Sequence, residues 1–150
     1  MPQRVKFASF NKVDMNSTKK IHNLVTRSSS HTTRHVLIND LILPARIGIH
    51  KHEKERPQRV RVNLDISVAE NGPIEKDHIS EVLNYEEIVE AVEVLVSEDH
   101  INLVETLAEK ISVLCLSYER VDAVIVRVEK LDVFKQAASV GVEINRIRQL

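Results

Sequence analysis

Apolar and polar residues alternate along several stretches of this chain. In "QRVRVNLDISV", residues 58–68, aliphatic side chains fall on one side and polar side chains on the other. Because successive side chains of a strand point to opposite faces, this pattern predicts a strand that buries one face. The aliphatic set is Val60, Val62, Leu64, Ile66 and Val68.

Three further stretches are predicted to form strands. Residues 121–130, "VDAVIVRVEK", and residues 139–147, "SVGVEINRI", also alternate with a period of two. Residues 35–49, "HVLINDLILPARIGI", predict either a pair of strands or one long bent strand. The alternating apolar positions are Val124, Val126 and Val128 in the first stretch and Val140, Val142 and Ile144 in the second.

Two stretches between these strands have apolar residues at helical spacing. They are "NYEEIVEAVEVLVSE", residues 84–98, and "NLVETLAEKISVLCLSY", residues 102–118. Each begins with an asparagine, Asn84 or Asn102, which predicts an N-cap, and each helix should bury one face. The apolar positions are Ile88, Ala91, Val92 and Leu95 in the first helix and Leu103, Leu107, Ile111 and Leu114 in the second.

The order strand, strand, helix, helix, strand, strand predicts an α+β fold, an antiparallel four-stranded sheet with two helices on one face. We expect the regular strands 59–68 and 121–129 to form edges, which invite pairing with another subunit. Closing several sheets into a barrel would remove the edges. Alternatively, Arg59, Arg61 and Arg127 could keep the outer face of the sheet in water.

Composition limits the kind of protein. The 150 residues are 43% hydrophobic and 3% aromatic, enough for one core built mostly of Val, Ile and Leu. The single cysteine, Cys115, lies in an apolar helical run, which indicates a packing role in a reducing compartment. No apolar run approaches the roughly 20 residues that cross a bilayer, and no secretion signal is evident. We therefore expect a soluble, cytoplasmic protein that does not bind membranes.

Residues 1–34 differ from the rest of the chain. They carry seven Lys or Arg residues against one acidic residue, Asp14, and include the polar run "RSSSHTTR". This composition predicts a disordered, basic, Ser/Thr-rich tail before a domain at residues 35–150. A transit peptide, or a start codon misplaced upstream of Met15, would look similar. A nucleic-acid-binding arm is not favoured, because the acidic domain would weaken attraction to phosphates.

The stretch "IGIHKHEKERPQ", residues 47–58, places His50, His52 and Glu53 in a turn. The two histidines would point to the same side of an extended segment and could bind zinc together with Glu53 or a distant histidine. No third ligand is evident, so we expect no metal site here.

Three polar residues lie at the ends of predicted elements. Glu105 is near the start of the second helix, where backbone N–H groups favour a carboxylate. Lys130 ends a strand, and Tyr85 begins the first helix. Each also fits an ordinary role, a solvated Glu or Lys and a packed Tyr, so the residues alone leave both interpretations open.

Five blocks of the sequence together resemble the dihydroneopterin aldolase family of folate biosynthesis. They are "GIHKHEKERPQRVRVNLDI", "LNYEEIVEAV", "LVETLAEKI", "VRVEK" and "AASVGVEINR", in this order over about residues 35–148. The resemblance implies the tunnelling fold, in which ββααββ units assemble through their sheets into a ring. Two rings usually stack as an octamer, so the implied assembly is a homo-oligomer, a tetrameric ring or an octamer, that binds a pterin.

The resemblance also implies roles for individual residues. Glu105 matches the glutamate that binds the amino and ring N–H groups of the pterin, with Val104 beside it in the substrate site. Leu83 and Tyr85 match residues that a neighbouring subunit brings to the site. Lys130 matches the catalytic lysine, Glu53 the acidic residue of the first loop, and Gln58 the glutamine after it. The implied catalytic set is Lys130, Tyr85 and Glu53, and His50 and His52 are incidental.

The implied reaction is a retro-aldol cleavage that releases glycolaldehyde from the side chain of dihydroneopterin. The substrate's own C6=N5 imine can accept the electrons, so neither a lysine Schiff base nor a metal is required, and we expect no cofactor. Lys130 and Tyr85 would then transfer protons with the help of bound water.

One residue departs from the aldolase pattern. Leu131 follows Lys130, whereas most aldolases of the family have proline there, and a Lys-Leu pair is familiar from related dihydroneopterin triphosphate 2′-epimerases. "AASVGVEINR" resembles the aldolase ending, so we favour the aldolase over the epimerase. A non-catalytic pterin-binding or structural ring is a third possibility, but such a ring has no reason to keep Lys130.

Overall fold

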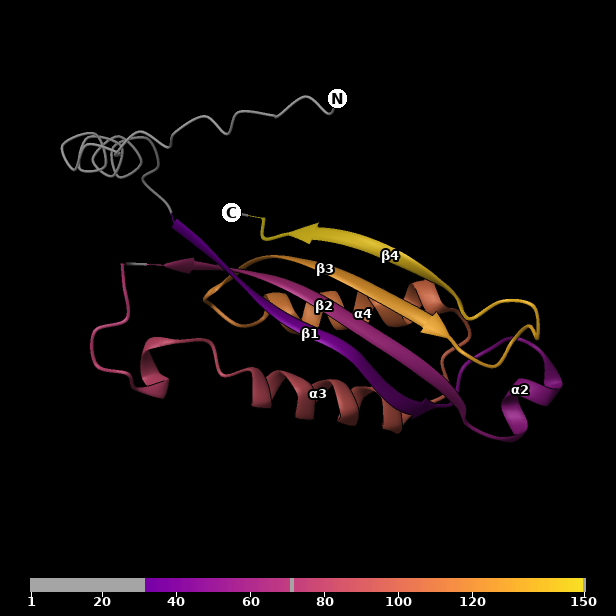
Figure 1. Ribbon diagram of the computed structural model, residues 1–150. Coiled ribbons are helices and arrows are strands. Elements are labelled where there is room, and N and C mark those ends of the chain that lie inside the picture. Colours follow the sequence, from indigo (N-terminus) through magenta and orange to yellow (C-terminus); the bar gives the residue numbers. More distant parts are fainter. Residues whose placement is uncertain (1–31, 71, 150) are drawn as a thin grey trace, which may run out of the picture. The chain divides into compact units, whose positions relative to one another are not determined.

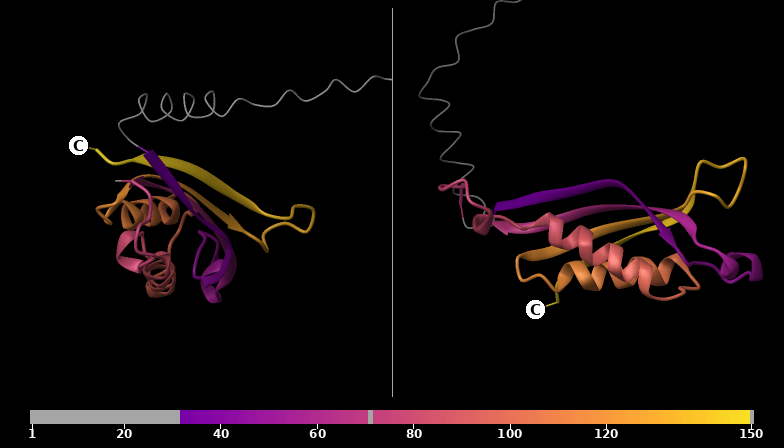
Figure 2. Two further views of the ribbon diagram at one scale, coloured as in Figure 1. Left: turned by 60° about the vertical axis from the view of Figure 1, so that its left-hand side comes forward. Right: turned by 90° about the horizontal axis from the view of Figure 1, so that it is seen from below.

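The computed structural model describes residues 32–70 and 72–149. Its strands and two long helices follow the predicted order, and α3 and α4 cover one face of a four-stranded sheet (Figures 1 and 2). The predicted α+β fold is therefore confirmed. The elements are β1 (Thr32–Ala45), α2 (Lys51–Glu55), β2 (Gln58–Glu70), the 3-10 helix η1 (Ile79–Glu81), α3 (Tyr85–Glu98), α4 (Val104–Leu116), β3 (Val121–Lys130) and β4 (Val140–Ile147).

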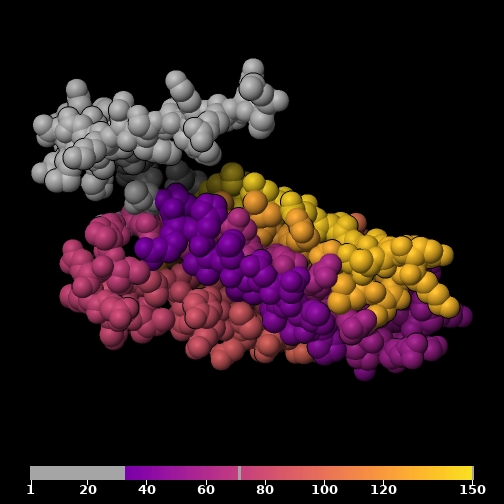
Figure 3. Space-filling view, in the orientation of Figure 1, coloured from indigo at the N-terminus to yellow at the C-terminus, as the bar shows by residue number. Residues whose placement is uncertain are grey.

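The strands lie in the order β1, β2, β3, β4, and each neighbouring pair is antiparallel. β2 and β3 are therefore central, and the prediction that residues 59–68 and 121–129 form edges is wrong. The edges are β1 and β4, and within the described residues neither pairs with a further strand on its outer side. Both run along the surface in the space-filling view (Figure 3).

β1 is one long bent strand, the second of the two predicted possibilities. Its register against β2 shifts between Ile38 and Leu41, and Asp40 has a φ of 55° at this bulge. The backbone N–H of Asp40 donates to Oδ1 of Asn63 at 2.8 Å, which satisfies a donor that the bulge removes from the ladder.

The start of β1 also changes the predicted domain boundary. Residues 32–34 pair with β2, so they belong to the sheet and not to the tail predicted at residues 1–34. Residues 1–31 lie outside the described residues, and the tail stays a prediction there.

The two long helices begin at different kinds of residue. The side chain of Asn84 accepts a hydrogen bond from the N–H of Glu86 at 3.1 Å, so the predicted cap of α3 is confirmed. The residue before α4 is Leu103, which is 48% exposed and lies outside the buried helix face; Asn102 is not the cap. Among the described residues, none of the helices has the length and hydropathy of a membrane-spanning segment.

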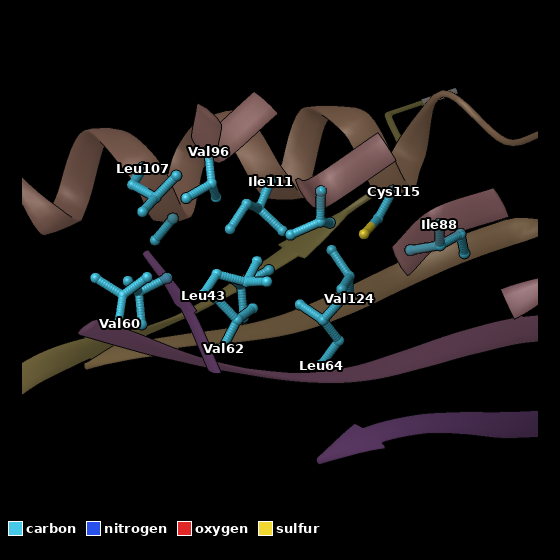
Figure 4. Packing of buried hydrophobic residues seen from close by; sticks show 14 of the residues in the cluster. Leu43, Val60, Val62, Leu64, Ile88, Val96, Leu107, Ile111, Cys115 and Val124 are labelled. Atoms are coloured by element: carbon cyan, nitrogen blue, oxygen red, sulfur yellow. The ribbon is translucent and has the colours of Figure 1, made fainter. Parts of the chain in front are cut away.

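The core fills the layer between the sheet and the helices. α4 packs against β3 and β4, and α3 packs against β1. Leu107 and Ile111 of α4 extend toward Val60 and Val62 of β2 (Figure 4), and all four are fully buried. Cys115 is buried in the same layer, and this desolvation raises the pKa of its thiol to about 12, as suits a packing role.

The alternating strand faces are buried as predicted, except in β4. All five aliphatic residues of β2 are buried, and so are the three predicted valines of β3, Val124, Val126 and Val128. In β4, Val142 and Ile144 are half-buried and Val140 is 42% exposed. The central strands therefore carry most of the core, and the edge strand contributes less.

Candidate active site

Glu53 is the only buried charged residue in the described part of the chain. It lies in α2, a short helix between β1 and β2 where the sequence predicted only a turn. The N–H of Glu53 donates to the carbonyl of His50 at 3.0 Å, and Oε2 of Glu53 accepts from the N–H of His50 at 3.1 Å. These reciprocal bonds fix the direction of the carboxylate.

Lys130 meets this carboxylate from the last position of β3. Its Nζ donates to Oε1 of Glu53 at 2.6 Å, and its side chain is 13% exposed. Gln58, the first residue of β2, donates from Nε2 to the same oxygen at 3.2 Å and to the carbonyl of Ile47 at 2.6 Å. The structure thus brings together three predicted site residues, and Gln58 supports Glu53.

The surroundings of Glu53 act on its pKa in opposite directions. Burial by itself raises the pKa, because it removes water from the charged form. The hydrogen bonds from Lys130, His50 and Gln58 outweigh this and lower the pKa from 4.5 to about 2. Glu53 is therefore a fixed negative charge at neutral pH.

Glu53 should stabilise the fold at neutral pH and lose this effect in acid. Its folded pKa lies below its ordinary value, so the contribution is complete above about pH 4.5 and is lost as the pH falls toward about 2. A shift of this size corresponds to about 3 kcal/mol. Urea unfolding of the wild type and of Glu53→Gln should show a stability difference at pH 7 that shrinks through this window.

The exposed neighbour Glu55 provides the control for this measurement. Glu55→Gln should differ little from the wild type at either pH. A wild-type advantage over Glu53→Gln that is equally large at pH 7 and pH 2 would show that the ionised carboxylate is not its source.

Gly48 makes room for the Glu53 carboxylate. Its φ is +130°, and a Cβ at this position would lie 2.6 Å from the Cβ of Glu53 and closer still to its carboxyl group. Glycine alone suits both the backbone conformation and the available space. Gly48 was not predicted as a site residue, although it is one of only three glycines and lies directly before a charged turn, which was a usable signal.

The segment before α4, residues 100 and 101, is hydrogen-bonded to the segment that contains Gly48. The N–H of Gly48 donates to the carbonyl of Ile101 at 2.9 Å, and the N–H of Ile101 donates to the carbonyl of Arg46 at 2.8 Å. Nε2 of His100 lies 2.7 Å from the carbonyl oxygen of Gly48. The start of α4 is thereby held at the same end of the sheet as Glu53. No sequence signal identified His100.

Glu105 and Val104 lie in the first turn of α4, at this end of the sheet. Val104 is half-buried, whereas Glu105 is exposed and its carboxylate has no hydrogen-bonding side chain among the described residues. The N–H groups at the start of a helix favour an anion here. The Glu105 carboxylate could thus accept hydrogen bonds from a ligand.

The start of α3 lies at the opposite end of the sheet from α2 (Figure 1), and Leu83 and Tyr85 belong to this start and the segment just before it. They line a hollow of about 910 Å³ together with Val68 of β2. Lys130 instead pairs with Val60, which is eight positions from Val68 along β2, a distance of about 26 Å. One chain therefore does not bring Tyr85 to Lys130.

The two histidines of the turn lie beside each other, and among the described residues the structure groups no third candidate metal ligand with them, Glu53 included. The rings of His50 and His52 stack with their centroids 5.6 Å apart. Within residues 32–70 and 72–149, no three His, Cys, Asp or Glu side chains are grouped so that they could bind a metal ion.

Comparisons with known proteins agree on one family. Residues 36–145 match the family model of dihydroneopterin aldolase. A dihydroneopterin aldolase of Streptomyces coelicolor is 33% identical over 85 residues, which cover 57% of this chain and 71% of that protein.

Solved structures with the same description are also similar. A protein of Vibrio cholerae assigned as dihydroneopterin aldolase has a TM-score of 0.71 and 26% identity over 78% of this chain and 99% of its own. The enzyme from Burkholderia thailendensis, bound to guanine, has a TM-score of 0.68 and 31% identity, and the match covers 78% of this chain and 93% of that one. The E. coli enzyme, in complex with neopterin, has a TM-score of 0.67 and 25% identity, and the match covers 75% of this chain and 98% of that one.

Proposed function

The chain belongs to the dihydroneopterin aldolase family, and we propose that it cleaves 7,8-dihydroneopterin in folate biosynthesis. The bond that breaks joins the side-chain carbon attached to ring atom C6 to the next carbon of the side chain, in a retro-aldol reaction. The products are 6-hydroxymethyl-7,8-dihydropterin and glycolaldehyde.

The ion pair between the buried Glu53 and the half-buried Lys130 carries this proposal. An ammonium group held 2.6 Å from a carboxylate, at the end of a strand and largely shielded from water, suits proton transfer at a defined position. A protein that only binds a pterin has no need of this pair. Gln58, which donates to the same carboxylate oxygen, supports the pair's geometry.

The substrate supplies the electron sink in the proposed mechanism. The side-chain hydroxyl loses a proton, the C–C bond breaks, and the electron pair moves into the C6=N5 imine to give an enamine. Protonation of the new carbon then restores the imine in the product. Lys130 and Tyr85, working with water, are our candidates for these proton transfers.

We propose that two neighbouring subunits complete each site. Leu83 and Tyr85 lie at the far end of their own sheet, so in a ring they would serve the Lys130 of the adjacent subunit. The unpaired outer sides of β1 and β4 in the described chain support assembly through the sheets. A tetrameric ring or a stacked octamer would both bring Tyr85 to a neighbour's Lys130 and pair the outer sides of β1 and β4.

Glu105 is the proposed anchor of the pterin ring. Guanine and neopterin, bound in two of the similar structures, share an amino group next to a ring N–H. A carboxylate can accept from both donors at once. The exposed position of Glu105 at the start of α4 leaves it open to this contact.

Glu105→Gln should weaken pterin binding by about 2 kcal/mol or more, roughly a 30-fold rise in Kd. The amide keeps the shape of the side chain but replaces one acceptor by a donor and removes the charge. Calorimetry with neopterin measures the change. Glu93→Gln, which alters an exposed carboxylate on α3, is the matched control. Equal affinities for the two variants would remove Glu105 from the site.

The 2′-epimerase is the second candidate, because Leu131 stands where most of the aldolases have proline. Epimerisation can use the same cleavage followed by recombination with the fragment turned over. Incubating the purified protein with dihydroneopterin and with its triphosphate, followed by chromatography of the products, separates the two functions. Glycolaldehyde from dihydroneopterin supports the aldolase. An unbroken epimer from the triphosphate alone would refute it.

A further inference from the structure

The backbone just after Lys130 is hydrogen-bonded to β2, although chain segments at the ends of strands commonly open. β3 ends at Lys130, but the N–H of Leu131 donates to the carbonyl of Arg59 at 3.1 Å. This bond continues the ladder between β2 and β3 by one residue. A proline at position 131 could not donate it.

Asp132 forms a side-chain ion pair with Arg59, the same residue of β2, and this pair is called the Arg59–Asp132 clasp. Nε and Nη2 of Arg59 donate to the two carboxylate oxygens of Asp132 at 3.1 and 2.6 Å. The backbone N–H of Arg59 makes a longer contact of 3.4 Å with the same carboxylate. The planar guanidinium holds the carboxylate in one orientation, which a single point contact would not do.

Arg59 is adjacent to Gln58, whose side chain supports Glu53. Successive side chains of a strand point to opposite faces, so Gln58 reaches Glu53 on one face and Arg59 reaches Asp132 on the other. Of these two consecutive residues of β2, one supports Glu53 directly and the other holds the chain just after Lys130.

We propose that the Arg59–Asp132 clasp is a positioning device that keeps Lys130 within reach of Glu53 during the reaction. The inference rests on the proposed function, because it assumes that the position of Lys130 limits the rate. Neither clasp residue touches Lys130 Nζ or the Glu53 carboxylate in the described structure, so both act through the backbone.

The clasp is exposed, so a loss of activity on removing it would not come from a loss of folding stability. The Arg59 and Asp132 side chains are 63% and 42% exposed, and ion pairs this open to water contribute little to folding stability. Arg127 and Glu143 form a comparable pair across β3 and β4, 54% and 48% exposed. Both of its residues lie inside paired strands, so it does not restrain the chain after Lys130.

The test compares Asp132→Asn and Arg59→Gln with the matched controls Glu143→Gln and Arg127→Gln. The clasp variants should lower kcat by about tenfold to a hundredfold, the size expected when a reacting group is displaced by a fraction of an ångström to one ångström. The Kd for neopterin and the Tm should barely change. The double variant Arg59→Asp with Asp132→Arg restores the opposite charges and should recover most of the lost activity.

A second readout does not depend on turnover. Acetic anhydride labelling, followed by peptide mass spectrometry, measures how fast Lys130 is acetylated. In the wild type its amine is shielded and bound to Glu53, so labelling should be slow; it should accelerate severalfold in the clasp variants and not in the controls. If one clasp variant does not fold, the other tests the same contact.

The two readouts distinguish the failure of each proposal. A wild type that cleaves neither substrate refutes the proposed function, and Lys130 labelling still decides whether the clasp positions the lysine. Equal kcat losses in clasp variants and controls, or unchanged labelling of Lys130 in the clasp variants, would overturn the clasp.

Discussion

Replacing Lys130 by methionine should lower kcat for dihydroneopterin cleavage by about two to four orders of magnitude, the usual range for a positioned proton-transfer group. Methionine keeps an unbranched stem of similar size but can neither donate nor accept the proton. Neopterin binding should change much less, because its ring is proposed to contact Glu105 and not the lysine amine. Steady-state kinetics and calorimetry measure the two effects separately.

The loss of the lysine also leaves Glu53 buried without its ion-pair partner. Removing one partner of a buried pair costs about 3–5 kcal/mol in general, so Lys130→Met should be less stable as well as less active. The double variant Lys130→Met with Glu53→Gln removes the unpaired charge and should recover stability without recovering activity. Lys135→Met, in the exposed segment between β3 and β4, is the control and should retain both. Activity that returned together with stability would show that Lys130 only supports the fold.

The same lysine distinguishes acid–base chemistry from covalent chemistry. If the substrate imine accepts the electrons, Lys130 never bonds to carbon, and borohydride added during turnover leaves its side chain unmodified. A Schiff base would instead be reduced to a stable adduct. A borohydride-dependent mass increase on the peptide that contains Lys130 would refute the proposed mechanism.

Periodicity in the sequence predicted the elements and their buried faces but not the order of the strands. Alternation shows which side of a strand is apolar, and it identified the buried valines of β3 correctly. It carries no information about which strands are neighbours, so β2 and β3 were assigned to the edges although they are central. Weak burial of β4 follows from its edge position, which the pattern also could not reveal.

The site was less accessible to sequence analysis, because its residues meet through tertiary contacts. Read alone, Lys130 looked like an ordinary strand-end lysine, and only the family resemblance related it to Glu53, 77 residues away. The clasp between Arg59 and Asp132 spans 73 residues and left no local pattern. Leu83 and Tyr85 stay predictions for the site, since one chain keeps them far from Lys130.

Gly48→Ala should lower kcat by at least about a hundredfold, although residue 48 need not contact the substrate. The new Cβ would occupy the space of the Glu53 side chain, so the carboxylate must shift from its present position beside Lys130. A misplacement of about 1 Å in a reacting group can cost this much in rate. The variant should also be less stable, because a φ of +130° strains alanine and the overlap strains the packing, each by about 1–3 kcal/mol.

Gly72→Ala separates these causes, because Gly72 has the same φ of +130° but nothing within 4 Å of the added Cβ. This control carries the backbone strain without the overlap. It should lose a comparable part of the stability, measured by urea unfolding, while its kcat stays near the wild-type value. The excess loss of activity in Gly48→Ala then measures the displacement of Glu53. Similar kcat values for the two variants would show that Glu53 tolerates displacement and is not required at its observed distance from Lys130.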